Sequence, residues 1–170
     1  MNSDTGKMKV CVGSGGMRAV VRDLLVAVLC SLVVLAASHV RVPFYPVPFT
    51  MQTLAVVCVS LFAGRRLALW SLLLFVELWG VFFATGGYIL GFFAVPFILG
   101  NNAAKLGSFS LLLRIFCSHL VVLAAGTAVL ACFIGMKAAF IGGFLFFVPS
   151  EIFKGSLAFA LARAVGKFSR

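Results

Sequence analysis

The sequence predicts an all-α integral membrane protein, a single bundle of six transmembrane helices. Two observations lead to this fold class. Of the 170 residues, 63% are hydrophobic and only 11% are charged, a balance that soluble domains rarely have. Six apolar stretches also follow one another along the chain, each bounded by turn-forming or basic residues. The composition therefore excludes an ordinary soluble globular domain.

The apolar stretches define the predicted helices, in order. They cover residues 21–39, 48–63, 67–83, 86–100, 108–132 and 138–162, and together they form one transmembrane domain over residues 21–170. Several are shorter than the ~20 residues that a helix needs to cross the hydrocarbon core, which fits helices that end at a cavity or a locally thinned bilayer. Residues 1–20 are polar and glycine-rich, and we interpret them as a disordered cytoplasmic tail. A signal peptide cut at Ala36-Ala37-Ser38 is the alternative.

The chain has a net charge of +10, and its basic residues lie at every second boundary between the predicted helices. Ten of them lie in the tail, after the second and fourth stretches and at the end of the chain: Lys7, Lys9, Arg18, Arg22, Arg65, Arg66, Lys105, Arg163, Lys167 and Arg170. The positive-inside rule then predicts a multi-pass protein of the cell (inner) membrane with both termini in the cytoplasm. No aromatic platform accompanies these charges, so they indicate contact with anionic membrane lipid and no nucleic-acid partner.

The stretch PVPFTMQT, from Pro46 to Thr53, separates the first two predicted helices. Proline removes a backbone donor and stops a helix, so residues 42–48 should be irregular. Irregular backbone at membrane depth persists only where protein or a water-filled cavity covers it. We therefore expect a loop folded over a ligand site, with Thr50 and Gln52 within reach of the ligand.

Glu151 and Lys154 lie inside the sixth predicted helix, where a charge costs about 3 kcal/mol by insertion scales. Their spacing of three residues places them on one helix face. One interpretation is a self-neutralising pair that only eases insertion. The other is a polar site that offers both an acceptor and a donor, as a cyclic urea or amide head group requires.

Other charged and aromatic residues are open to two interpretations each. Glu77, in the third predicted helix, is either a protonated packing residue or a partner of Arg114 or Lys154, and Arg114 is expected to snorkel toward the cytoplasmic side. Arg41, beside the proline stretch, is either an ordinary surface residue or a carboxylate ligand. Four aromatic residues near the same face could wall a cavity: Phe44, Tyr45, Trp79 and Tyr88.

Enzymatic and metal-binding motifs are absent from the sequence. The five cysteines stand apart, and His39 and His119 are isolated, so we assign them packing or interfacial roles and expect no metal or cofactor. The sequence contains no GxxxxGK[ST], HExxH, GxSxG or Rossmann fingerprint. We therefore predict no catalytic residues and no enzyme, and any ATP-driven transport would draw its energy from another subunit. A small polytopic membrane enzyme or structural subunit is the alternative.

Three segments, in the same order along the chain, resemble the BioY family, the biotin-binding S components of energy-coupling factor transporters. VPFYPVPFTMQTLAVV, residues 42–57, resembles the family's proline-rich first loop and the Thr-x-Gln-Thr helix after it. TGGYILGF, residues 85–92, is similar to the family's Gly-Gly-Tyr-x-x-Gly-Phe string. VPSEIFKGSLAFALA, residues 148–162, looks like the Pro-x-x-Asp-x-x-Lys helix with Glu in place of Asp.

The resemblance implies a six-helix protein that captures biotin at the outer face and delivers it through a transmembrane coupling subunit driven by two ABC-type ATPases. By resemblance, Glu151 and Lys154 would contact the ureido ring, Arg41 would face the carboxylate, and Gln52 and Tyr88 would line the cavity. Small residues of the first helix would dock the coupling subunit, and these are Ala27 and Ser31.

The chain departs from the family pattern at two places. The segment ELWGVFFATGGY, residues 77–88, is shorter than its counterpart in the family, and Phe83-Ala84 replaces the usual Gly-Pro. Glu151 in place of Asp adds a methylene, which would move the carboxylate by about 1.5 Å. These departures motivate a second hypothesis, in which the same scaffold binds another small vitamin or a biotin precursor.

Overall fold

The computed structural model describes residues 14–43, 45, 47–79, 85–101, 103 and 106–168. Phe44, one of the expected aromatic walls, and residues 80–84 of the short segment before Tyr88 lie outside these residues. The described chain is mostly helical, with one two-stranded hairpin. In order, its elements are α1 (Ser14–His39), β1 (Arg41–Val42), β2 (Phe49–Thr50), α2 (Gln52–Trp79), α3 (Gly86–Leu99), α4 (Ser108–Ile134), α5 (Met136–Ala139), the π-helical turn η3 (Phe140–Leu145) and α6 (Val148–Phe168).

Within the described residues, four helical stretches are long and apolar enough to cross a membrane: Gly16–His39, Gln52–Glu77, Ser108–Ile134 and Met136–Val165. α3 is apolar but shorter. α1 begins at Ser14, ahead of the expected start at residue 21, so the last part of the expected tail is helical. The prediction placed the start at the first apolar run, whereas helical backbone also forms through the preceding Arg18, whose long side chain favours it.

Gly64 interrupts α2 at the boundary between the second and third predicted helices. Its backbone has φ 80° and ψ 169°, a left-handed conformation that glycine adopts without a Cβ clash. The following Arg65 donates its backbone N–H to Asn101 Oδ1 at 3.1 Å, a bond to the segment between α3 and α4. α2 therefore consists of two helical segments joined at a kink, which lies in AGRR (residues 63–66), the predicted boundary between the second and third apolar stretches.

The proline-containing segment after α1 is more ordered than the sequence suggests. β1 and β2 pair antiparallel, with Arg41 opposite Thr50 and Val42 opposite Phe49. A further backbone bond joins Met51 N–H to the Val40 carbonyl at 3.1 Å. The all-α expectation and the irregular assignment of Val42 are therefore wrong at this hairpin, because extended chain on either side of the prolines pairs with itself and satisfies its backbone groups.

Close packing between α3 and α4 depends on glycine. A Cβ at Gly87 would lie 2.5 Å from the Ala125 carbonyl oxygen, and a Cβ at Gly91 would lie 2.8 Å from Val122 Cα. Real side chains cannot occupy such space, so glycine lets the two backbones approach, as small residues do between membrane helices.

α1 turns its small residues inward. Ala27, Ser31, Val34 and Ser38 form one buried face, and α1 packs mainly against α2. Ala27 is 1% exposed and Ser31 is 0% exposed, so in this arrangement neither offers a surface to a coupling subunit. The docking role expected for this pair is therefore wrong here, because the small side chains are used to bring α1 close to α2. The opposite face of α1 exposes large apolar side chains.

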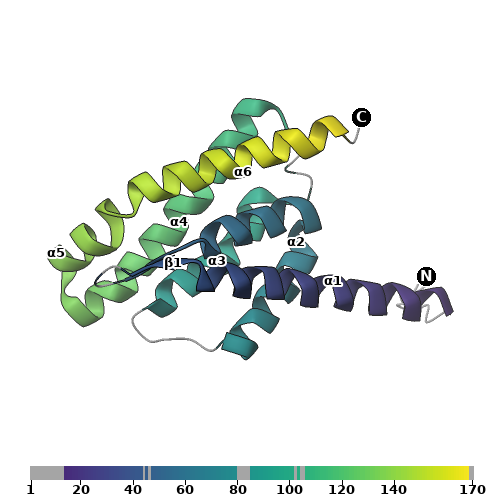
Figure 1. Cartoon of the computed structure of the whole chain (residues 1–170), viewed down its shortest axis with the longest axis horizontal. Coiled ribbons are helices and arrows are strands. Elements are labelled where there is room, and N and C mark those ends of the chain that lie inside the picture. The colour runs from purple at the N-terminus through teal and green to yellow at the C-terminus, as the bar shows by residue number, and fades with distance from the viewer. Residues whose placement is uncertain are drawn as a thin grey trace, which may run out of the picture.

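Both ends of the described chain lie at the same end of the bundle (Figure 1). The beginning of α1 and the end of α6 are there, while the β1–β2 hairpin and α5 lie toward the opposite end (Figure 1). Arg163 near the end of α6 donates to the Leu106 carbonyl at 2.9 Å, which ties the segment between α3 and α4 to this end. Arg65, which follows the kink at Gly64, contacts the same segment through the bond from its backbone N–H to Asn101.

Candidate functional site

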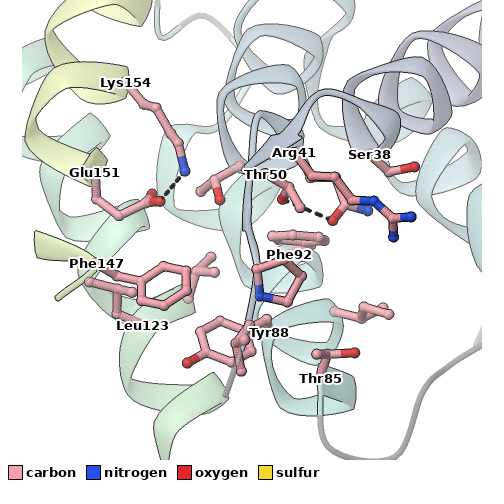
Figure 2. Close-up of a pocket in the computed structure, with 16 residues that line it drawn as sticks. Ser38, Arg41, Thr50, Thr85, Tyr88, Phe92, Leu123, Phe147, Glu151 and Lys154 are labelled. Carbon is pink, nitrogen blue, oxygen red and sulfur yellow. Dashed lines mark hydrogen bonds and ion pairs between the residues drawn. The ribbon is translucent and has the colours of Figure 1, made fainter. Parts of the chain in front are cut away.

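A cavity of about 300 Å³ lies between the hairpin, α3, α4 and the beginning of α6. The structure brings together in its lining six of the residues that the sequence singled out: Arg41, Thr50, Gln52, Tyr88, Glu151 and Lys154. Figure 2 shows Glu151 and Lys154 on one side of the cavity and Arg41 with Ser38 on the other. Residues from both halves of the chain thus meet at one place.

The first turns of α6 supply a buried ion pair. Lys154 Nζ lies 2.5 Å from Glu151 Oε1, and the two side chains are 3% and 6% exposed. The Glu151 backbone N–H bonds the Phe147 carbonyl at 2.9 Å, so the helix has already begun where the carboxylate leaves it. The predicted spacing on one helix face is therefore realised, and the pair presents a carboxylate acceptor and an ammonium donor side by side.

His119 of α4 completes this group from a second helix. Its Nδ1 lies 2.5 Å from Glu151 Oε2, and its side chain is 2% exposed. The isolated packing role assigned to His119 is therefore wrong, because folding brings it across 32 positions of sequence to Glu151. The sequence contained two hints of this contact: Glu151 is an acid in a membrane helix that needs a partner, and His119 is a polar residue in a largely apolar stretch. Sequence spacing alone could not show that these two residues meet.

Glu77 stands apart from this group. Its side chain is exposed on α2, and neither of its two expected partners is bonded to it. Lys154 is paired with Glu151, while Arg114 donates to the Leu99 carbonyl at 3.1 Å and to the Ile98 carbonyl at 3.3 Å. Of the two interpretations of Glu77, pairing with Arg114 or Lys154 is thus wrong, and Arg114 instead satisfies carbonyls at the end of α3.

The opposite side of the cavity carries polar side chains from the hairpin and the start of α2. Arg41 is exposed at the rim, and strand pairing places it opposite Thr50. Thr50 Oγ1 donates to Gln52 Oε1 at 3.1 Å, which fixes the Gln52 side chain (Figure 2 marks this bond). The Gln52 amide group keeps its N–H donors, and Arg41 brings a planar cation that matches a carboxylate.

Aromatic rings form much of the wall between the two polar sides. Tyr88, Phe92 and Phe147 lie around the cavity in Figure 2. The Tyr88 hydroxyl donates to the Gly143 carbonyl at 2.7 Å, so its polar end is used within the protein and its ring serves as wall. The ring centroids of Phe147 and Tyr88 are 6.0 Å apart.

Several wall residues were not anticipated from the sequence. Phe92, Leu123 and Phe147 are ordinary apolar helix residues there, and only the packing of α3, α4 and α6 identifies them as cavity lining. Tyr45 was expected to contribute a wall, but it is 86% exposed and does not line the cavity, because it lies at the tip side of the hairpin. The Trp79 side chain, like Phe44, falls outside the described part of the chain.

The chemistry of the cavity follows from this arrangement. One side offers a carboxylate and an ammonium group, the middle is apolar and aromatic, and the other side offers a guanidinium with amide and hydroxyl groups. Such a cavity suits a ligand with a neutral head group that both donates and accepts hydrogen bonds, an apolar body and an anionic end. Among the residues that the structure describes, no cluster of His, Cys, Asp and Glu could hold a metal ion.

Comparison with known proteins points to one family. The BioY family model matches residues 7–170. A relative from Pyrococcus horikoshii, named probable biotin transporter BioY, is 31% identical over 153 residues, covering 81% of this chain and 91% of the relative. A relative of the same name from Rickettsia prowazekii is 27% identical over 149 residues, covering 78% and 77% of the two chains.

A solved structure shares the fold. It is described as the S-component for biotin from an ECF-type ABC transporter, and it superimposes with a TM-score of 0.66. The match covers 91% of this chain and 94% of the other, at 17% sequence identity. The mostly helical architecture is thus that of an S component.

Proposed function

Because the chain belongs to the BioY family, we propose that it is the biotin-binding membrane subunit of a vitamin transporter and that the cavity between Arg41 and Glu151 holds the ligand. The observation that carries the assignment is the joining, in one cavity, of a buried acceptor–donor pair with a cationic rim. Two relatives that bear the name of a biotin transporter support the choice of ligand.

The ligand chemistry matches the two sides of the cavity. Biotin has a ureido ring with two N–H donors and one carbonyl acceptor, an apolar bicyclic body and a carboxylate on a flexible chain. In our proposal Glu151 accepts from a ureido N–H, and Lys154 donates to the ureido carbonyl. The body packs on Tyr88 and its aromatic neighbours. Arg41 binds the carboxylate at the rim, with Gln52 beside it.

We extend the proposal to topology. The kink at Gly64 divides α2 into two spans, which with α1, α3, α4 and the α5–η3–α6 unit gives six crossings. The basic positions Arg65 and Arg163 contact the segment between α3 and α4, near the end of α6. By the positive-inside rule this end faces the cytoplasm with both termini, and the cavity opens on the outer side of the inner membrane.

Energy for uptake would come from other subunits. The sequence has no P-loop, so a transmembrane coupling subunit and ABC-type ATPases are the proposed partners. Ala27 and Ser31 are buried, so we propose that a partner contacts the apolar outward face of α1, which includes Leu25, Leu29 and Leu32.

Thermal unfolding of the detergent-purified protein with and without biotin tests the proposed ligand. A ligand that binds only the folded protein adds about 2.7 kcal/mol to its stability at a hundredfold excess over Kd. We expect a rise in Tm that disappears in Glu151→Gln, which keeps the side-chain volume and removes the charge. Glu77→Gln, an exposed acid away from the cavity, is the matched control and should respond to biotin like the wild type.

Other vitamins serve as the comparison set in the same assay. A wild-type protein that ignores biotin but responds to a biotin precursor or to another small vitamin would overturn the ligand and keep the scaffold. Absence of any response in a folded wild-type protein would contradict the binding function itself.

A further inference from the structure

His119 lies directly behind the proposed head-group site. We infer that His119 is a positioning residue for ligand binding, which holds Glu151 through a hydrogen bond from Nδ1–H so that the carboxylate and Lys154 face the ligand in a fixed geometry. The inference deepens the proposed biotin site and rests on it. His119 itself does not line the cavity, so its effect on a ligand must pass through Glu151.

The geometry gives each carboxylate oxygen of Glu151 its own partner. Oε1 accepts from Lys154 Nζ and Oε2 lies 2.5 Å from His119 Nδ1. The two partners come from different helices, α6 and α4, so the carboxylate is held from two directions. All three side chains are at least nine-tenths buried, so water competes little for these bonds.

The imidazole ring is itself fixed by close packing. A Cβ at Gly155 would lie 3.4 Å from His119 Cδ2 and 3.2 Å from a ring carbon of Phe116. Glycine at this position of α6 therefore makes room for the histidine ring edge between the two helices. The other ring nitrogen, Nε2, is buried with no partner among the described residues, so the ring interacts through Nδ1.

The physical reason for a positioning role is the freedom of a glutamate side chain. Without the bond to His119, the Glu151 carboxylate could rotate and offer both oxygens to Lys154, which would close the ion pair on itself. With Oε2 held by His119, Lys154 engages Oε1 alone and keeps further N–H donors for a ligand carbonyl. A bond to a charged acceptor of this kind typically changes an equilibrium by about tenfold to hundredfold when it is removed.

Two substitutions separate the hydrogen bond from simple packing. His119→Leu removes the donor and keeps an apolar side chain of moderate size. His119→Asn keeps an amide N–H close to the position of Nδ1. We expect the biotin Kd, measured by isothermal titration calorimetry, to rise about tenfold to hundredfold in the leucine variant and to recover most of the way in the asparagine variant. His39→Gln, at the exposed end of α1, should leave Kd unchanged.

A spectroscopic measurement on the intact cavity tests the same bond without removing it. The chain has two histidines, so His39→Gln leaves His119 as the single histidine signal in a protein labelled with ¹⁵N-histidine. We expect the Nδ1 chemical shift of a protonated nitrogen, since the bond to Glu151 fixes the proton there. A histidine that only fills space has no reason to prefer this tautomer.

The outcomes distinguish the two proposals. A wild-type protein that does not bind biotin defeats the proposed ligand, while the nitrogen spectrum still decides whether His119 donates to Glu151. An unprotonated Nδ1 overturns the positioning role, and so does a folded leucine variant with wild-type affinity. Equal loss of affinity in the leucine and asparagine variants also overturns it, because it would indicate packing in place of hydrogen bonding.

Discussion

Lys154 Nζ lies 2.5 Å from Glu151 Oε1 within the first turns of α6, and both side chains are almost fully buried. A buried ion pair of this kind is a coupled unit, since removal of one partner leaves the other charge without compensation. In this chain the unit also lines the cavity proposed for biotin, so its contributions to stability and to binding have to be separated.

Lys154→Met should destabilise the protein by about 3–5 kcal/mol, because Glu151 would keep a buried charge. The double variant Glu151→Gln/Lys154→Met removes both charges and should be more stable than the single Lys154 variant. Chemical denaturation in detergent measures both. Neither variant should bind biotin, and a double variant less stable than the single one would contradict the coupling.

Arg41→Ala should weaken biotin binding about tenfold, through loss of a charge-assisted bond at a partly solvated rim. The same substitution should leave the affinity for biotin amide nearly unchanged, because the amide carries no carboxylate. Titration of both ligands against both proteins gives the comparison. An equal loss for biotin and its amide would place the Arg41 effect elsewhere than on the carboxylate.

Tyr88→Phe should cost about 0.5–1.5 kcal/mol of stability and leave biotin affinity close to that of the wild type. The hydroxyl donates to the Gly143 carbonyl, so its removal deletes one buried hydrogen bond and keeps the aromatic wall. Tm and Kd of the variant test the two parts separately. A large loss of affinity with unchanged Tm would mean that the hydroxyl contacts the ligand.

Gly126→Ala should destabilise the protein by about 1–3 kcal/mol and weaken ligand binding, through displacement of the Tyr88 ring. A Cβ at this position would lie 2.2 Å from Tyr88 Cδ1. Gly107→Ala, where a Cβ meets nothing within 4 Å, is the matched control. Thermal unfolding should separate the two variants, and equal Tm values would contradict the proposed crowding.

The sequence by itself determined the features that depend on local patterns. Apolar runs predicted the helices, AGRR predicted the break at Gly64, and the three-residue spacing placed Glu151 and Lys154 on one face. The family resemblance pointed to Arg41, Gln52 and Tyr88, which line the same cavity. Such features are readable because helix periodicity, backbone conformation and insertion into lipid act over neighbouring residues.

Only the tertiary structure decided which distant residues meet. It brought His119 to Glu151, buried Ala27 and Ser31 against the bundle, left Glu77 at the surface and paired the two short strands. In apolar helices many residues could face inward, and the sequence pattern does not choose among them. The choice is made by close packing at sites such as Gly87 and Gly155, where the shapes of two helices determine which side chains touch.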